Sequence, residues 1–257
     1  MKNHIKNKTA LITGATSGIG KQLAIDLSAL KLNLVLIARD KKKLKTLKKF
    51  LSKTSNKQIT AVTLDVRDKD TVEKKLKKLL QEQTVDILIN NAGLALGLEG
   101  IDEGETDQWD AMIDTNIKGL LYVSKPIIKQ MRGLQTAHIV NIGSVAGKTA
   151  YPGGNVYCAT KAAVHALGEA MHTDMMGTQV KVTTIAPGAV HTAFSTIRFS
   201  GDQSKVDATY RGYTPLYAKD ISHAILCVLN TPPHVNIQYL DIMPTAQRNP
   251  YLLHRDT

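Results

Sequence analysis

Residues 9–20 read TALITGATSGIG, an apolar run that leads directly into a glycine-rich turn. The pattern Gly14-x-x-x-Gly18-x-Gly20 is followed by leucines at helical spacing. Glycines in such a turn let the backbone approach a pyrophosphate closely, and the N-terminus of the next helix offers free N–H groups to that anion. The stretch therefore predicts a strand, a phosphate-binding turn and a helix, with a plain strand-to-helix turn as the alternative.

The alternation of apolar runs and amphipathic segments continues along the chain with short connections. It predicts parallel strands joined by right-handed helical crossovers, in a sheet covered by helices on both faces. We expect one doubly wound α/β domain over residues 1–257 with a seven-stranded sheet, its cofactor-binding part at about 8–150 and its catalytic and substrate part at about 140–245. The expected strands are 9–13, 32–38, 59–66, 85–89, 137–142, 180–185 and 235–242, and the later helices are 40–53, 71–81, 106–130, 155–175 and 220–229.

The charge of the chain is unevenly distributed. Its 33 basic and 22 acidic side chains give +11, but residues 1–81 alone carry 20 basic and 6 acidic groups, a net +14. Most of these lysines surround two amphipathic helical segments and have few aromatic neighbours, so the stacking platform of single-strand binders is missing. We interpret them as solvated helix faces and expect no nucleic acid partner.

The composition excludes other classes of protein. Two cysteines exclude a disulfide-rich secreted fold, and no apolar run approaches the length of a membrane span. Residues 1–8 are polar and lack the apolar block of a signal peptide. The eight histidines show no metal-ligand spacing, so no metal is expected. A cytoplasmic protein without membrane contact is therefore predicted.

The end of the second expected strand indicates which dinucleotide would bind. An acidic residue there would accept the ribose hydroxyls of NAD, but Ala38 holds that place and Arg39 follows. A guanidinium suits a 2′-phosphate, so NADP(H) is favoured over NAD(H). Asp40 leaves the choice open, because a shift of one residue in the alignment would reverse it.

A tyrosine and a lysine stand one helical turn apart at Tyr157 and Lys161. A free tyrosine has a pKa of about 10, and a nearby ammonium favours its phenolate form. Such a pair can remove a proton from an alcohol, or donate one to a carbonyl, while a hydride moves to or from a cofactor.

These segments, taken together and in order, resemble the short-chain dehydrogenase/reductase family. The resemblance rests on the glycine turn, Asn90-Asn-Ala-Gly93, Asn116, Ser144, Tyr157-x-x-x-Lys161 and Pro187-Gly188, across roughly residues 8–245. It implies a Rossmann fold and an oxidoreductase acting on a CH–OH group.

The resemblance also implies a role for each matching residue. Tyr157 would be the general acid/base, Ser144 would bind the reacting oxygen, Lys161 would bind the nicotinamide ribose and lower the tyrosine pKa, and Asn116 would hold a water in a proton relay. Besides Arg39, Tyr157 and Lys161, the implied cofactor-binding residues are Gly14, Thr16, Ser17, Gly18, Ile19, Gly20, Asp65, Val66, Asn91, Ala92, Gly93, Pro187, Gly188, Val190 and Thr192.

A narrower similarity extends to the NADP-dependent 3-hydroxy acid dehydrogenases of this family, which include the L-allo-threonine and serine dehydrogenases. Residues 90–97, 112–116, 153–157, 194–202 and 234–237 carry it. It implies a small substrate of the serine, allo-threonine or 3-hydroxypropionate type. Such a substrate has a carboxylate, and Arg198 is the candidate cation to bind it, with a surface arginine in a mobile loop as the alternative.

Other functions stay open at this point. A reductase of the same family could act on a larger carbonyl compound, such as a 3-oxoacyl thioester, a steroid or a sugar. A non-catalytic NADP-binding regulator would be of another class, although the intact Asn116, Ser144, Tyr157 and Lys161 argue against it. The resemblance further implies a homodimer or homotetramer.

Overall fold

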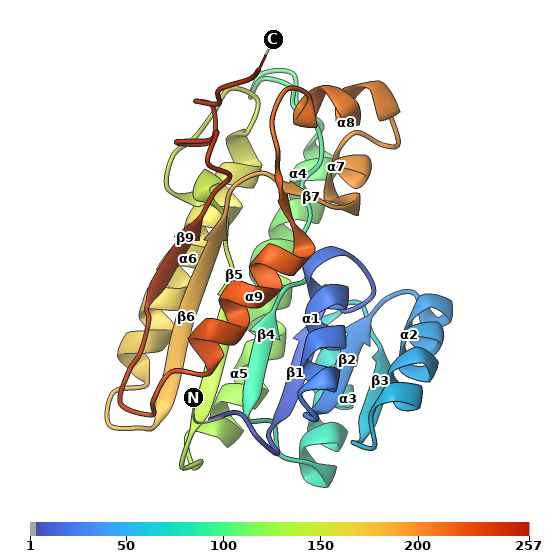
Figure 1. Ribbon diagram of the computed structural model, residues 1–257, viewed down its shortest axis with the longest axis vertical. Helices are drawn as coiled ribbons and strands as arrows, with labels where there is room; N and C mark the ends of the chain where they lie inside the picture. The colour runs from blue at the N-terminus through green and yellow to red at the C-terminus, as the bar shows by residue number, and fades with distance from the viewer. Residues whose placement is uncertain (1–3, 257) are drawn as a thin grey trace.

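A computed structural model of the chain describes residues 4–256. Residues 1–3 and 257 of the expected domain, and with them the start of the polar segment 1–8, lie outside the described residues. Its centre is a sheet of seven parallel strands in the order β3-β2-β1-β4-β5-β6-β9 (Figure 1). The fold class and the expected number of strands are confirmed. The strands are β1 (Thr9–Thr13), β2 (Asn33–Ala38), β3 (Ile59–Thr63), β4 (Ile87–Asn90), β5 (Ala137–Ile142), β6 (Val180–Pro187) and β9 (Tyr239–Ile242).

Helices cover both faces of this sheet, which explains why its inner strands are apolar almost throughout. Ala10 and Ile12 of β1 face α1 (Gly18–Ala29), α2 (Lys41–Thr54) and α9 (Ala218–Leu229). Leu11 faces the opposite core under α3 (Lys69–Glu82), α5 (Gly119–Met131) and α6 (Asn155–Asp174). The carboxyl ends of the strands therefore form one edge between two helical layers.

One expected helix is interrupted. The segment 106–130 consists of α4 (Thr106–Ile113), a five-residue π-helix η1 (Asp114–Lys118) and then α5. A π-helical turn inserts one residue into the hydrogen-bond ladder, which hydrophobic spacing does not reveal, and such turns are frequent at functional sites. Asn116 lies within it.

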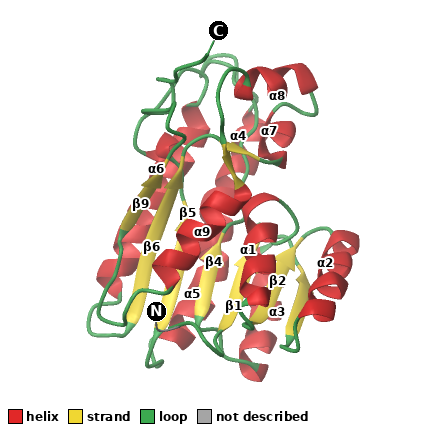
Figure 2. Cartoon of the chain, viewed as in Figure 1, coloured by secondary structure: helices red, strands yellow, loops and turns green. Residues whose placement is uncertain are grey.

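The chain between β6 and α9 forms a cap over the carboxyl ends of the strands, as Figure 2 shows. It contains α7 (Ala193–Arg198), α8 (Gln203–Tyr210) and a small parallel pair of strands, β7 (Val190–His191) and β8 (Leu216–Tyr217). These short elements were not expected from the sequence. The cap places α7 over the carboxyl ends of the strands, the same edge of the sheet at which the glycine turn follows β1.

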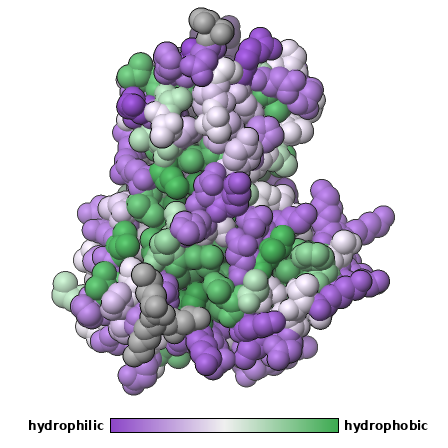
Figure 3. Space-filling model, viewed as in Figure 1, coloured by the Kyte–Doolittle hydropathy of each residue, from purple (hydrophilic) through white to green (hydrophobic). Residues whose placement is uncertain are grey.

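The lysine-rich helices are surface helices. On α2 only Leu44, Leu47 and Leu51 are buried, and every lysine of α2 and α3 is exposed. Hydrophilic side chains accordingly cover the edge of the molecule where α2 lies (Figure 3). Within residues 4–256 no helix combines the length and the apolar character needed to cross a membrane.

Candidate active site

The glycine turn after β1 is shaped by two backbone conformations and one side chain. Gly14 and Gly18 have φ values of +64° and +48°, which side chains on L-residues rarely adopt. A Cβ at Gly20 would lie 2.6 Å from the Gly14 carbonyl oxygen. The Asn91 amide donates to the carbonyls of Thr13 and Gly14, so the loop after β4 holds the turn in place.

The turn delivers the open N-terminus of α1 to the cleft. Thr16 and Ser17 precede the helix, and Ser17 makes no side-chain capping hydrogen bond. The first N–H groups of a helix have no acceptor within it, so those of Gly18, Ile19 and Gly20 face outward. This cradle fits an anion such as a pyrophosphate.

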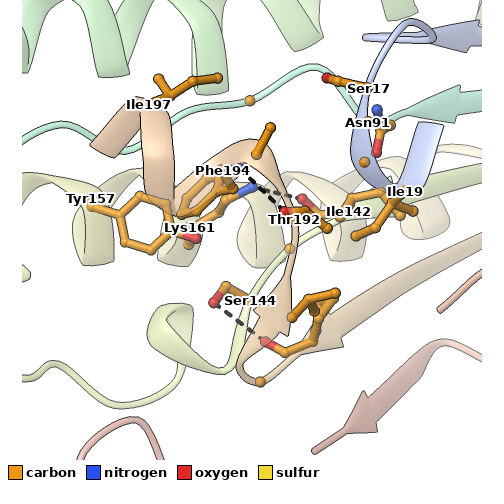
Figure 4. A pocket seen from close by; sticks show the side chains of 17 residues that line it. Ser17, Ile19, Asn91, Ile142, Ser144, Tyr157, Lys161, Thr192, Phe194 and Ile197 are labelled. Atoms are coloured by element: carbon orange, nitrogen blue, oxygen red, sulfur yellow. Dashed lines mark hydrogen bonds between the residues drawn. The ribbon is translucent and has the colours of Figure 1, made fainter. Parts of the chain in front are cut away.

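A pocket of about 150 Å³ lies in front of this cradle. Figure 4 shows side chains from β5, α6 and α7 that converge on it. Residues expected from the sequence line it: Ser17, Gly18, Ile19, Asn91, Gly93, Ser144, Tyr157, Lys161, Pro187, Gly188, Val190 and Thr192. It is also lined by residues that sequence reasoning missed, namely Ile142, Gly143, Ala193, Phe194 and Ile197.

The missed apolar residues of α7 close one side of the pocket. The Phe194 ring lies 5.8 Å from the Tyr157 ring, centroid to centroid. Thr192 caps α7 by accepting a hydrogen bond from the Phe194 N–H at 3.2 Å. The apolar side chains within residues 193–197 were a signal in the sequence. Without the position of the cap helix, however, the sequence did not show that they face the pocket.

Tyr157 and Lys161 lie on one face of α6, and both are buried. The Lys161 ammonium donates to the Ile142 carbonyl at 2.8 Å. Burial lowers the Lys161 pKa to about 8. Burial also raises the Tyr157 pKa above its ordinary value, although Ser144 and Arg198 act in the opposite direction. The phenol is therefore protonated at neutral pH.

Ser144 follows β5 and caps a short 3-10 turn, η2 (Val145–Gly147). Its hydroxyl accepts from the Ala146 N–H at 3.1 Å and donates to the Pro187 carbonyl at 3.5 Å. These contacts place the hydroxyl beside Tyr157 on the wall of the pocket.

Asn116 lies behind the pocket, in the π-helical turn. Its side chain accepts from the Leu94 N–H at 2.9 Å and donates to the Leu94 carbonyl at 2.8 Å and to Thr160 Oγ1 at 3.0 Å. A Cβ at Gly93 would lie 3.2 Å from Asn116 Oδ1 and 3.4 Å from Lys161 Nζ. Asn116, Gly93 and Lys161 are thus neighbours.

The other end of the strand edge holds the residues expected at the adenosine. Asp40 is turned away to cap α2, where its carboxylate accepts the Lys43 N–H at 2.9 Å. Asp65 is paired with Arg67, with Nη2 2.7 Å from Oδ2. Burial acts to raise the pKa of Asp65, but the hydrogen bonds and charge of Arg67, helped by Arg39, lower it.

Two further expected residues, Ala92 and Val66, make structural contacts near this edge of the sheet. Ala92 N–H donates to Thr13 Oγ1 at 2.9 Å, which fixes the loop after β4 against β1. Val66 is buried and packs against Gly119, where a Cβ would lie 2.6 Å from its Cγ2. The Val66 side chain is therefore part of the core.

Arg198 ends α7 and lies beside Tyr157, although it is not among the residues that line the pocket. Its Cζ lies 5.6 Å from the centroid of the Tyr157 ring and 5.5 Å from that of Tyr151. Nε donates to the Gly97 carbonyl at 3.1 Å, and Nη1 donates to the Tyr151 hydroxyl at 2.6 Å. Nη2 is buried and has no hydrogen-bond partner among the described residues.

Comparisons with known proteins agree with this arrangement. The short chain dehydrogenase family profile matches residues 8–202. The chain is 41% identical over 239 residues to NADP-dependent 3-hydroxy acid dehydrogenase YdfG of Salmonella typhi, which covers 92% of this chain and 95% of that protein. It is also 41% identical over 238 residues to sulfoacetaldehyde reductase of Chromohalobacter salexigens, with 92% and 93% covered.

Among solved structures, the closed form of serine dehydrogenase complexed with NADP+ superimposes with a TM-score of 0.90. That alignment has 40% sequence identity and covers 96% of this chain and 99% of the other. The extent of the family match and the identity to these relatives settle the family. The chain belongs to the short-chain dehydrogenase family of oxidoreductases.

Proposed function

We propose that the chain is an NADP(H)-dependent oxidoreductase that transfers a hydride between the nicotinamide and a small 3-hydroxy acid. The substrate would be of the serine, allo-threonine or 3-hydroxypropionate type. The observation that carries this proposal is the buried, unpartnered Nη2 of Arg198 beside Tyr157, within the described part of the chain. A buried N–H without a partner is costly, and an anionic group would satisfy it.

The arrangement around Arg198 limits where that anionic group can lie. Gly97 and Tyr151 occupy Nε and Nη1 and hold the guanidinium plane in one orientation. The Tyr151 hydroxyl accepts from Arg198, so its own proton is free to be donated. A carboxylate bound by Nη2 and the Tyr151 hydroxyl would lie beside Tyr157, which together with Ser144 would bind the reacting oxygen.

The preference for NADP(H) is supported by the charges at the adenosine end. Arg39 would hold the 2′-phosphate. Asp40 is engaged as a helix cap, and the charge of Asp65 is offset by its ion pair with Arg67. YdfG is named as NADP-dependent, and the serine dehydrogenase structure contains NADP+.

The pocket residues fit the roles expected of them. When bound, the nicotinamide cofactor supplies or accepts the hydride. Tyr157, protonated because burial raises its pKa, would donate a proton to the carbonyl oxygen, and Ser144 would hold that oxygen by a hydrogen bond. Lys161 would stabilise the phenolate that remains, and Asn116 would lie at the exit of the proton path.

The cofactor itself would be held by groups from several loops. The glycine turn and the N-terminus of α1 would bind the pyrophosphate, and residues 91–93 would line the adenosine side. The segment from Pro187 to Thr192 would contact the nicotinamide. Its Thr192 methyl group already lies opposite Gly18, 3.5 Å from where a Cβ would be.

A second candidate activity is the reduction of a small sulfonate aldehyde, because the sulfoacetaldehyde reductase is as similar to the chain as YdfG. A sulfonate and a carboxylate are both anions that Arg198 can bind. Rates with 3-hydroxypropionate and with isethionate, measured under one set of conditions, separate the two. A higher kcat/KM with isethionate would favour the sulfonate.

The proposal includes assembly and location. Both cysteines are unpaired, which suits the reducing cytoplasm. We also propose a homodimer or homotetramer, whose mass light scattering would measure. A single 28.0 kDa species at working concentration would contradict this part of the proposal.

A further inference from the structure

We propose that His165 is a positioning residue for Ser144. Helix α6 would thereby fix the positions of both Tyr157 and Ser144, the two residues proposed to bind the reacting oxygen. The inference rests on the proposed function, in which Tyr157 and Ser144 hold that oxygen. Tyr157 and His165 lie on the same helix, two helical turns apart. His165 is directed at the backbone of Ser144.

The contact between His165 and Ser144 is a single hydrogen bond in a closed space. Nε2 of His165 lies 3.0 Å from the Ser144 carbonyl oxygen, and the residue is only 8% exposed. A carbonyl oxygen can only accept, so Nε2 must carry the proton. A Cβ at Gly143 would lie 2.7 Å from Nε2, so the ring contacts the chain immediately before Ser144 as well.

The imidazole ring is itself held from β9. Its centroid lies 5.9 Å from that of Tyr239, with the two rings inclined by 29°. The Tyr239 hydroxyl donates to the His165 carbonyl at 3.3 Å. Lys148 lies 5.5 Å from the centre of the Tyr239 ring and binds both oxygens of Asp241 at 2.7 Å. The Tyr239 ring, itself held by these contacts, therefore limits movement of the imidazole away from Ser144.

The position of the Ser144 hydroxyl depends on this peptide. The Ala146 N–H and the Pro187 carbonyl fix the hydroxyl from one side, and His165 fixes the backbone carbonyl from the other. The same carbonyl also accepts the Gly147 N–H at 3.0 Å within η2. Without His165 this single backbone hydrogen bond would hold the peptide, so the hydroxyl could shift away from the Tyr157 side of the pocket. Misplacement of a reacting group by about 1 Å can cost about two orders of magnitude in rate.

The protonation state of His165 is consistent with this role. Burial and the charges of Lys148 and Lys161 lower its pKa, against the Ser144 hydrogen bond and the charge of Asp241. The ring is therefore neutral at pH 7 and has one N–H, which the geometry assigns to Nε2. In a neutral ring the Nδ1–H tautomer would not make the contact.

The test compares two variants of similar size. His165→Gln keeps an amide N–H that can reach the Ser144 carbonyl, whereas His165→Met removes the donor. We expect kcat of the methionine variant to fall by about tenfold or more, with the KM for NADPH and the fluorescence of bound NADPH unchanged. The glutamine variant should recover most of kcat. His172→Met, on the same helix beyond the site, is the matched control and should behave as wild type.

Two results would overturn the proposal. One is a methionine variant with the kcat of wild type, and the other is an equal loss in both variants at unchanged cofactor binding. If wild type turns over no substrate, the proposed function fails instead, and nitrogen-15 NMR of the His165 ring still tests the contact. A Nδ1–H tautomer in folded wild type would contradict it, whatever the methionine variant does.

Discussion

Cζ of Arg198 lies 5.6 Å from the centroid of the Tyr157 ring, so a guanidinium from the cap helix faces the tyrosine of the proposed catalytic pair. The two residues are 41 positions apart in the sequence. Only the fold of the 190–217 cap brings them together.

Replacing Arg198 should separate anionic from neutral substrates. Loss of a charge-assisted hydrogen bond costs about 1.5–3 kcal/mol. For Arg198→Met we therefore expect kcat/KM for 3-hydroxypropionate to fall roughly 10- to 150-fold. The neutral analogue 1,3-propanediol should change little. An equal loss with both substrates would mean that Arg198 only fastens α7 to Gly97 and Tyr151. Arg211→Met, an exposed arginine beyond α8, is the control.

Replacing Arg39 should change the cofactor preference. Arg39→Asp places a carboxylate where the 2′-phosphate is expected, so kcat/KM for NADPH should fall and the ratio to NADH should reverse or approach one. Lys45→Asp makes the same charge change on the exposed side of α2 and should leave that ratio unaffected. Equal ratios in wild type and Arg39→Asp would refute the assignment of the phosphate to Arg39.

Asp40 should matter for stability and not for cofactor choice, because its carboxylate caps α2. Loss of such a cap costs about 0.5–2 kcal/mol. We expect Asp40→Ala to lower the free energy of unfolding by that amount, measured by urea denaturation. Asp68→Ala, which removes the equivalent cap of α3, should cost a similar amount. A changed NADPH-to-NADH ratio in Asp40→Ala would show that Asp40 contacts the ribose.

Removing the Tyr157 hydroxyl should stop the chemistry and spare cofactor binding. General acid catalysis contributes about 10²–10⁴-fold, so Tyr157→Phe should lose at least that factor in kcat. The Kd for NADPH, measured by fluorescence, should stay within a few-fold of wild type. Retained turnover in Tyr157→Phe would remove Tyr157 from the mechanism.

Above neutral pH, the rate of carbonyl reduction should follow the protonation of Lys161. Tyr157 stays protonated at neutral pH because burial raises its pKa, so carbonyl reduction should be flat up to about pH 8. Above that value Lys161, with its pKa lowered to about 8, loses the charge that stabilises the phenolate left by proton donation. Reduction should then slow. Lys161→Arg keeps its charge, so the same alkaline decline in that variant would contradict the account.

Hydrophobic spacing predicted most of the fold, because the inner strands are apolar along most of their length and the main helices are apolar on one side. The strand boundaries differ by a few residues: the expected strand 59–66 stops at Thr63, and the expected strand 235–242 begins only at Tyr239. The π-helical turn at Asn116 and the short elements of the cap left no periodic signal. They depend on tertiary contacts such as the hydrogen bond between Arg198 and Tyr151.

The residues proposed as catalytic could be singled out in the sequence because their spacing is local. Tyr157 and Lys161 are one turn apart on a helix, and Ser144 follows a buried strand. The sequence left the role of Asp40 open, and the structure accounts for this carboxylate as a helix cap. The environment was less predictable: the sequence suggested a Tyr157 pKa lowered by Lys161, whereas burial raises it. Phe194, Ile197 and His165 were missed, since each acts only through a distant partner.

The most direct test of the central claim is the oxidation of 3-hydroxypropionate and of 1,3-propanediol by purified wild type, each with NADP+ and with NAD+. The proposed function predicts the highest kcat/KM for the acid with NADP+, with a loss when either the carboxylate or the 2′-phosphate is removed. Equal or better turnover of the neutral diol, or a preference for NAD+, would contradict it.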